Sequence, residues 1–159
     1  MSNALTVTAP EGLPFINTSR EFDAPVEAVF AAHTQADLFR RWIGAGFPDV
    51  DLPVFDCTSG GSYRFVHKSE QGEYGFHGCY HLVRENERII WTFEFEGAPD
   101  IVSVETLDFV DLGGGRTRCD VHSVYPALEA RDAMIQSGMQ QGMEAGYAVL
   151  DALLAGVSA

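Results

Sequence analysis

The sequence predicts an α+β domain in which a curved antiparallel sheet wraps around one long C-terminal helix. Segments with alternating apolar and polar residues follow one another from about residue 53 to 125, and short turns separate them. This pattern is typical of an antiparallel meander. Two short segments with helical spacing precede the meander, and a long amphipathic segment follows it at about 128 to 156. A sheet with one aromatic face and a helix with one apolar face bury both surfaces by covering each other.

Length and charge limit the classes of protein to consider. The chain has 159 residues, which suits a single domain over 15–159. Two prolines and one glycine in residues 1–14 predict a flexible leader there. A net charge of −13 disfavours nucleic acid and anionic membranes as partners. The three cysteines form no CxxC pair, and the N-terminus has no secretory pattern, so we expect a cytoplasmic protein without a disulfide framework.

The first third of the chain predicts one strand and two short helices. The stretch from Phe15 to Asp23 alternates like a strand. Pro25 suits the first turn of a helix over about 25 to 33. A second helix is expected at about 35 to 43, with Thr34 and Asp37 as a capping box and Trp42 closing the sheet end. Six further strands would follow, so the sheet would have six to seven strands in the order β-α-α-β-β-β-β-β-β-α.

The meander predicts which side chains face the helix. Alternation places a set of mainly aromatic side chains on one face, and polar residues oppose them. This inner set is Tyr63, Phe65, His67, Ile89, Trp91, Phe93, Phe95, Glu105, Leu107 and Phe109. A buried carboxyl group must be paired or protonated. For Glu105 the candidate partners are Arg20, Ser123 and Tyr63.

Glycine recurs once per turn in the last helix, at positions 138, 142 and 146. Each costs about 1 kcal/mol relative to alanine inside a helix. The neighbouring row includes Met139, Met143 and Tyr147. Two interpretations stay open. The sheet backbone packs tightly against the glycines, or the missing side chains leave a cavity bordered by the adaptable methionines.

The order of these elements resembles the helix-grip (START-like, SRPBCC) superfamily, and more narrowly the branch named after the activator of the heat-shock protein 90 ATPase. The segments that carry the resemblance run from about residue 16 to 156. They are "REFDAPVEAVFAAHT", "LFRRWIG", "SGGSYRF", "FHGCYHLV", "ERIIWTFEF", "GGGRTRCDVHSVYP" and "SGMQQGMEAGYAVLDALLA".

The resemblance implies a ligand cavity between the sheet and the long helix. The superfamily includes lipid and hormone binders, polyketide cyclases, antibiotic-sequestering proteins and cochaperone domains, so no single catalytic motif carries over. Similar proteins often have an acidic residue where this chain has Leu82, so a role for that carboxylate is not expected.

The predicted function is binding of a small apolar or aromatic molecule in this cavity. Its expected walls are Tyr63, Phe65, His67, Trp91, Phe93, Glu105, Leu107, Met139, Met143 and Tyr147. The alternatives are a cyclase, dehydratase or hydrolase in which His67 and Glu105 meet as an acid–base pair, and a chaperone-regulating domain. A chaperone and a second copy of the chain stay open as protein partners.

No metal or cofactor is expected. His77, Cys79 and His81 form an H-x-C-x-H pattern on one strand. The two histidines would lie roughly 13 Å apart along that strand, too far for one zinc ion. We therefore expect a polar outer sheet face at these positions. No phosphate-binding loop, nucleophile elbow or HExxH motif is present.

Overall fold

The computed structural model describes residues 3–158 as one eight-stranded antiparallel sheet with four helices. The strands are β1 (Thr6–Thr8), β2 (Phe15–Phe22), β3 (Asp49–Phe55), β4 (Ser62–Ser69), β5 (Gly72–Arg84), β6 (Arg88–Phe95), β7 (Ser103–Gly113) and β8 (Arg116–Val124). The helices are α1 (Val26–Thr34), α2 (Ala36–Ile43), α3 (Leu128–Gln136) and α4 (Met139–Ser158). The predicted fold class is thus confirmed, with one strand more than expected.

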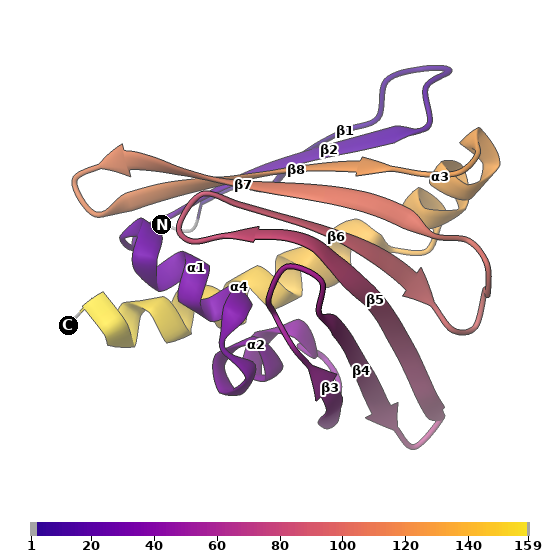
Figure 1. The fold of residues 1–159 in the computed structure, drawn as a ribbon, viewed down its shortest axis with the longest axis horizontal. Coiled ribbons are helices and arrows are strands. Elements are labelled where there is room, and N and C mark those ends of the chain that lie inside the picture. The colour runs from indigo at the N-terminus through magenta and orange to yellow at the C-terminus, as the bar shows by residue number, and fades with distance from the viewer. Residues whose placement is uncertain (1–2, 159) are drawn as a thin grey trace.

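The sheet curves around the helices (Figure 1). Its strand order is β1-β2-β8-β7-β6-β5-β4-β3, so β3 to β8 form the predicted meander and β2 pairs beside β8. We call the end that carries the β4–β5 turn, the β6–β7 loop (residues 96–102) and α3 the open end. The closed end carries the β7–β8 turn and α1. In Figure 1, α4 runs from the open end to the closed end across the concave side.

The N-terminal segment is more ordered than the expected flexible leader over 1–14. Thr6–Thr8 forms the edge strand β1 and pairs with residues 17 to 19 of β2. The segment from Pro10 to Leu13 is also fixed, because the backbone carbonyls of these two residues accept hydrogen bonds from the buried Arg131 of α3. The leader prediction is therefore wrong for this part of the chain. Three residues are too short for alternation to predict a strand.

The other edge strand also extends beyond its prediction. β3 begins at Asp49, whereas the alternating pattern indicates only the last residues of the strand. Pro53 obscures the pattern because it cannot donate a ladder hydrogen bond. It is accommodated where the register with β4 shifts, between Asp51 and Val54.

The two short helices fill the concave face at the closed end. Pro25 is the N-cap of α1, whereas the sequence predicted it as the first helical residue, and α2 begins after Gln35 without a side-chain cap. The Thr34 hydroxyl instead donates to the Phe30 carbonyl, so the capping-box prediction is wrong. Phe39 is fully buried, and its ring contacts those of Phe65 and Trp91. α2 therefore occupies space that the sequence assigned to a cavity.

The single long helix of the prediction is two helices. α3 ends at Gln136, and Gly138 has φ +86°, a conformation that glycine adopts at little cost. α4 then begins at Met139. The apolar rows continue across the break in the sequence, which is why spacing alone predicted one helix.

The C-terminal half of α4 is fixed to the sheet by a buried ion pair. Arg20 of β2 points inward, and its guanidinium contacts both carboxylate oxygens of Asp151 at 2.6 and 2.7 Å. The guanidinium also lies over the rings of Phe22 and Tyr147. Tyr147 in turn stacks on Trp42 of α2. These contacts determine how α4 crosses the concave face.

Candidate functional site

The inner face of the sheet is buried at the closed end and partly accessible at the open end. Ile89, Leu107 and Phe109 are buried under the helices. Nearer the open end, half-buried aromatic side chains form a continuous surface that we call the aromatic floor. The floor consists of Phe76, Trp91, Phe93 and Phe95. Ring centroids of Phe76 lie 5.4 Å from Phe93 and 5.1 Å from Phe95.

The glycine row of α4 differs from one position to the next. A Cβ atom added at Gly146 would lie 3.3 Å from the Trp42 carbonyl oxygen, so this glycine lets α2 approach. A Cβ at Gly142 would meet nothing within 4 Å, and Gly142 is exposed. Close packing thus explains position 146, although the neighbour is a helix and not a strand. The N-terminal half of α4 is left without a tight packing partner at Gly142.

The space beside the first turns of α4 is open. Met139 and Met143 are half-buried, and Gln140 and Gln141 beside them are exposed. Two hollows stand out among residues 3–158, and both lie away from the glycine row. One of about 350 Å³ lies between α2 and β3, and one of about 220 Å³ lies beside β1 on the outer face. Neither of these two hollows is the cavity expected beside the glycine row, so that cavity stays a prediction.

Replacing the two glycines with alanine will distinguish these environments. We expect Gly142→Ala to raise the free energy of unfolding by about 1 kcal/mol, because an exposed helical glycine gains helix propensity. Gly146→Ala should raise the free energy of unfolding by clearly less, since the added methyl group must displace Trp42. Urea unfolding of both variants measures the difference. Equal gains would show that Trp42 does not press on α4.

One carboxyl group lies on this inner face, at the side of the floor near β7. Glu105 is opposite Trp91 of β6 and Ser123 of β8 in the strand register. The Trp91 indole N–H donates to one carboxyl oxygen at 2.7 Å, and the Ser123 hydroxyl donates to the other at 2.8 Å. Burial raises the pKa of Glu105, while both hydrogen bonds act in the opposite direction. Glu105 is thus paired within the sheet, yet its side chain is partly accessible.

Of the three predicted hydrogen-bond partners of Glu105, one contacts it and two bind other groups. Ser123 is confirmed as a partner, and Trp91 is the partner that alternation did not identify. Arg20 pairs with Asp151. The Tyr63 hydroxyl donates to the Thr92 carbonyl at 2.6 Å.

His67 lies at the far side of the aromatic floor, near the tip of β4. Its ring contacts Phe47, Phe65 and Phe76 at centroid distances of 4.5, 5.3 and 5.1 Å. Its Nε2 atom is buried and has no hydrogen-bond partner in the protein. Burial lowers the pKa of His67, and a hydrogen bond to the backbone of Ile43 partly offsets this.

The hypothetical acid–base pair of His67 and Glu105 is wrong. His67 is opposite Tyr74, whereas Glu105 aligns through Trp91 with Tyr80. Six residues of β5 separate these two positions, which corresponds to roughly 20 Å along the strand. Three strand spacings add to that distance across the sheet. The two groups therefore cannot act together on one bond.

The other predicted wall residues divide into two groups. Tyr63, Phe65, Leu107 and Tyr147 are on the expected faces and belong to the packed core. Trp91, Phe93, Met139 and Met143 are half-buried at the open end. Phe76 and Phe95 also belong to the floor but were not predicted as wall residues. Their signal was in the sequence, since Phe95 shares the parity of Trp91 and Phe93, and Phe76 alternates with His77, which was expected on the outer face.

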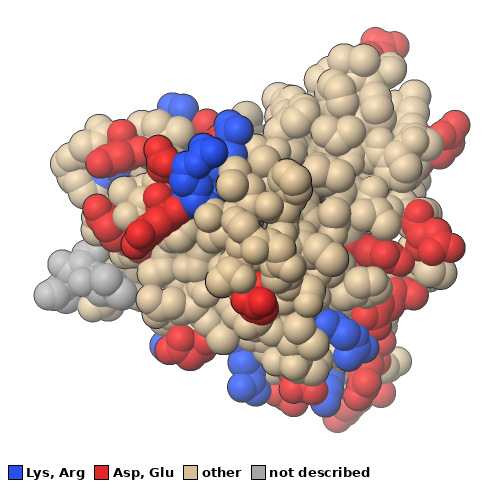
Figure 2. All heavy atoms as spheres, in the orientation of Figure 1, with Lys and Arg blue, Asp and Glu red and all other residues tan. Residues whose placement is uncertain are grey.

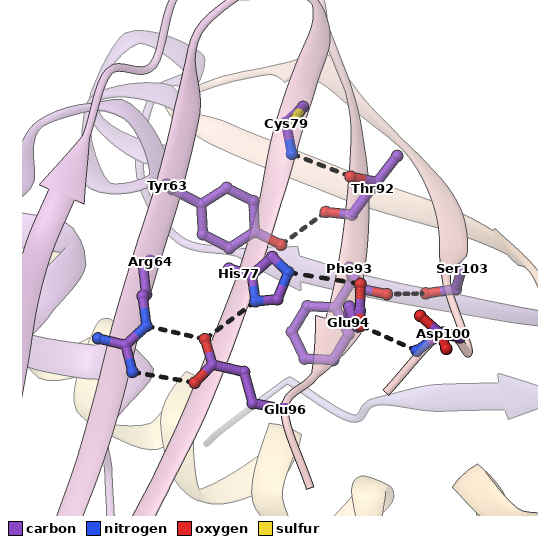
Figure 3. Close-up of polar contacts among 10 residues, drawn as sticks. All are labelled: Tyr63, Arg64, His77, Cys79, Thr92, Phe93, Glu94, Glu96, Asp100 and Ser103. Atoms are coloured by element: carbon purple, nitrogen blue, oxygen red, sulfur yellow. Dashed lines mark hydrogen bonds and ion pairs between the residues drawn. The ribbon is translucent and has the colours of Figure 1, made fainter. Parts of the chain in front are cut away.

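The H-x-C-x-H segment of β5 lies on the outer face, as expected. Figure 3 shows His77 between β4 and β6, where its Nδ1 lies 2.9 Å from a Glu96 oxygen. Arg64 binds the same carboxylate through two N–H groups. The hydrogen bonds from Arg64 and from His77 lower the pKa of Glu96 to about 2. Among residues 3–158, no group of three His, Cys, Asp or Glu side chains is arranged to hold a metal ion.

The surface charge bears on what could bind here. Figure 2 shows acidic side chains gathered along the edges of this view, with basic ones between them, while the middle is largely uncharged. With a net charge of −13, the protein repels anions at long range. No described helix is long and apolar enough to cross a membrane.

Comparison with known proteins identifies the family. The model described as "Activator of Hsp90 ATPase homolog 1-like protein" matches residues 23–155. The chain belongs to this family. No curated protein matches the sequence.

Solved structures share the helix-grip fold. A crystal structure from Rhodobacter sphaeroides is 28% identical, covers 96% of this chain and 99% of its own, and has a TM-score of 0.87. A Mycobacterium smegmatis protein is 21% identical, with 95% and 97% coverage and a TM-score of 0.84. A solution structure from Arthrobacter aurescens is 22% identical, with 94% and 91% coverage and a TM-score of 0.84. All three support the fold.

Proposed function

We propose that this protein binds a small, uncharged, apolar or aromatic molecule on the aromatic floor, beneath the first turns of α4. The observation that carries the proposal is the partial exposure of Phe76, Trp91, Phe93 and Phe95 on the inner face of the sheet. Concave apolar surfaces with a few polar groups are the usual form of a ligand site. Met139 and Met143 supply adaptable contacts on the opposite side.

Glu105 provides the polar group that would orient the ligand. Both of its oxygens already accept one hydrogen bond, from Trp91 and from Ser123, but a carboxyl group has further acceptor capacity. The negative net charge favours an uncharged ligand over an anion. Turnover is not part of the proposal.

Binding of the neutral fluorophore N-phenyl-1-naphthylamine tests this function. We expect one molecule to bind per chain and Phe93→Ala to weaken binding about tenfold, which corresponds to ~1.4 kcal/mol of lost contact. Val104→Ala is the matched control, because Val104 is 46% exposed on the outer face of the neighbouring strand. Binding that Phe93→Ala leaves unchanged, or no binding at all, would contradict the proposal.

A chaperone-regulating role is the second candidate, favoured by the description of the family. Exposed apolar side chains at the open end, Leu13, Ile101, Val102 and Ile135, would suit a protein partner. The ATPase rate of an Hsp90-type chaperone distinguishes the candidates. A regulator changes that rate when no small molecule is present, and Ile101→Asp weakens the effect. A ligand-binding protein leaves the rate unchanged.

A further inference from the structure

His67 carries a buried polar atom that the protein does not satisfy. Its Nε2 has no hydrogen-bond partner and no solvent contact. Such atoms are rare in native structures because desolvation without a hydrogen bond costs free energy. The other ring nitrogen is available for the hydrogen bond to the Ile43 backbone. A nitrogen that donates to a carbonyl carries the proton, which leaves Nε2 as an acceptor in the neutral ring.

The surroundings of this nitrogen are aromatic. Phe65 and Phe76 flank the His67 ring within the sheet, and Phe76 continues into the aromatic floor through Phe93. Phe47 lies against the ring from the α2–β3 connection. Phe47 is half-buried and directly follows Gly46, which has φ +92°. Of these three phenylalanines around the His67 ring, Phe47 is therefore the one that does not belong to the sheet.

We propose that His67 selects ligands that carry a hydroxyl or N–H donor on an apolar ring, with Nε2 accepting that hydrogen bond. The inference rests on the proposed function, because it requires a ring on the floor beside Phe76. Phe47 moves aside as the ligand arrives, and the ligand supplies both the ring contact and the missing hydrogen. The donor thus satisfies an atom that the free protein leaves unpaired.

A matched pair of probes tests this inference. 2-Naphthol and 2-methylnaphthalene have nearly the same shape, and only the first has a donor. Titration calorimetry gives the ratio of their affinities for the unaltered protein, His67→Phe and His67→Gln. We expect His67→Phe to reduce the preference for 2-naphthol roughly fivefold, the usual effect of one neutral hydrogen bond. His67→Gln, whose amide oxygen can accept, should keep part of the preference.

A spectroscopic readout separates recognition from a structural role. In long-range ¹H–¹⁵N spectra, Nε2 should have the shift of an unprotonated ring nitrogen, and 2-naphthol but not 2-methylnaphthalene should move it. An affinity ratio that is the same in the unaltered protein and in His67→Phe would overturn the inference while the proposed function stands. A protonated Nε2 in the free protein would also overturn it. If neither probe binds, the proposed function fails and the inference fails with it.

Discussion

Asp151→Asn is expected to lower the free energy of unfolding by about 3 kcal/mol. Arg20 is 5% exposed and loses the charge that balances its guanidinium. Removing one member of a buried ion pair leaves an unpaired charge, which typically costs 3–5 kcal/mol. We expect the lower end of this range because Asp151 is 31% exposed and the Glu21 carbonyl still accepts from Arg20. Urea unfolding measures the change.

Asp108→Asn is the control for that variant. Arg88 and Asp108 form a pair with similar two-point geometry, at 2.6 and 3.1 Å, but both side chains are about 40% exposed on the outer face. Exposed pairs contribute about 0–1 kcal/mol. Similar losses in both variants would show that Arg20 and Asp151 do not hold α4 in place.

Acid should destabilise the protein through His33. The ring is buried against Trp42 and Phe109, and its Nδ1 lies 2.8 Å from the Val29 carbonyl. Burial lowers its pKa to about 4, against the hydrogen bond to Val29. Relative to an ordinary pKa of 6.5, this corresponds to about 3 kcal/mol. Below pH 6.5 the histidine of the unfolded chain binds a proton, whereas the buried ring of the folded protein stays neutral until about pH 4. The free energy of unfolding therefore falls as the pH decreases from 6.5 to 4, and this loss is complete below pH 4.

The measurement is the pH dependence of the free energy of unfolding, compared with that of His33→Phe. The comparison matters because Glu105, whose pKa is raised by burial, acts in the opposite direction: its contribution to stability increases as the pH decreases. Subtracting the two profiles isolates His33. A difference that stays constant between pH 7.5 and 4 would show that the ring is protonated in the folded protein as easily as in the unfolded chain.

Local alternation predicted the inner face correctly. Tyr63, Phe65 and His67 share one side of β4, as do Trp91 and Phe93 on β6. The cost of burying an unpaired carboxylate also predicted that an inward-facing Glu105 must be paired or protonated, and Ser123 is one of its partners. Period-two spacing depends only on the chain direction of one strand, which is why these inferences hold.

The errors concern contacts between segments that are distant in the sequence. Phe39 fills the middle of the concave face from α2, and helical spacing says nothing about how deep a helix inserts. The separation of His67 from Glu105 depends on the register of four strands, which shared parity does not reveal. The partner of Arg20 lies 131 residues away. Even the helix break at Gly138 is hidden, because the apolar rows on either side remain in phase.

The methyl resonances of the methionines test the central claim most directly. With methionine labelled by ¹³C at the methyl group, titration with N-phenyl-1-naphthylamine should shift the signals of Met139 and Met143 with one common affinity, and Phe93→Ala should weaken that affinity to the same extent at both. Unmoved Met139 and Met143 signals, while the emission of the fluorophore still reports binding, would show that the ligand does not bind between α4 and the aromatic floor.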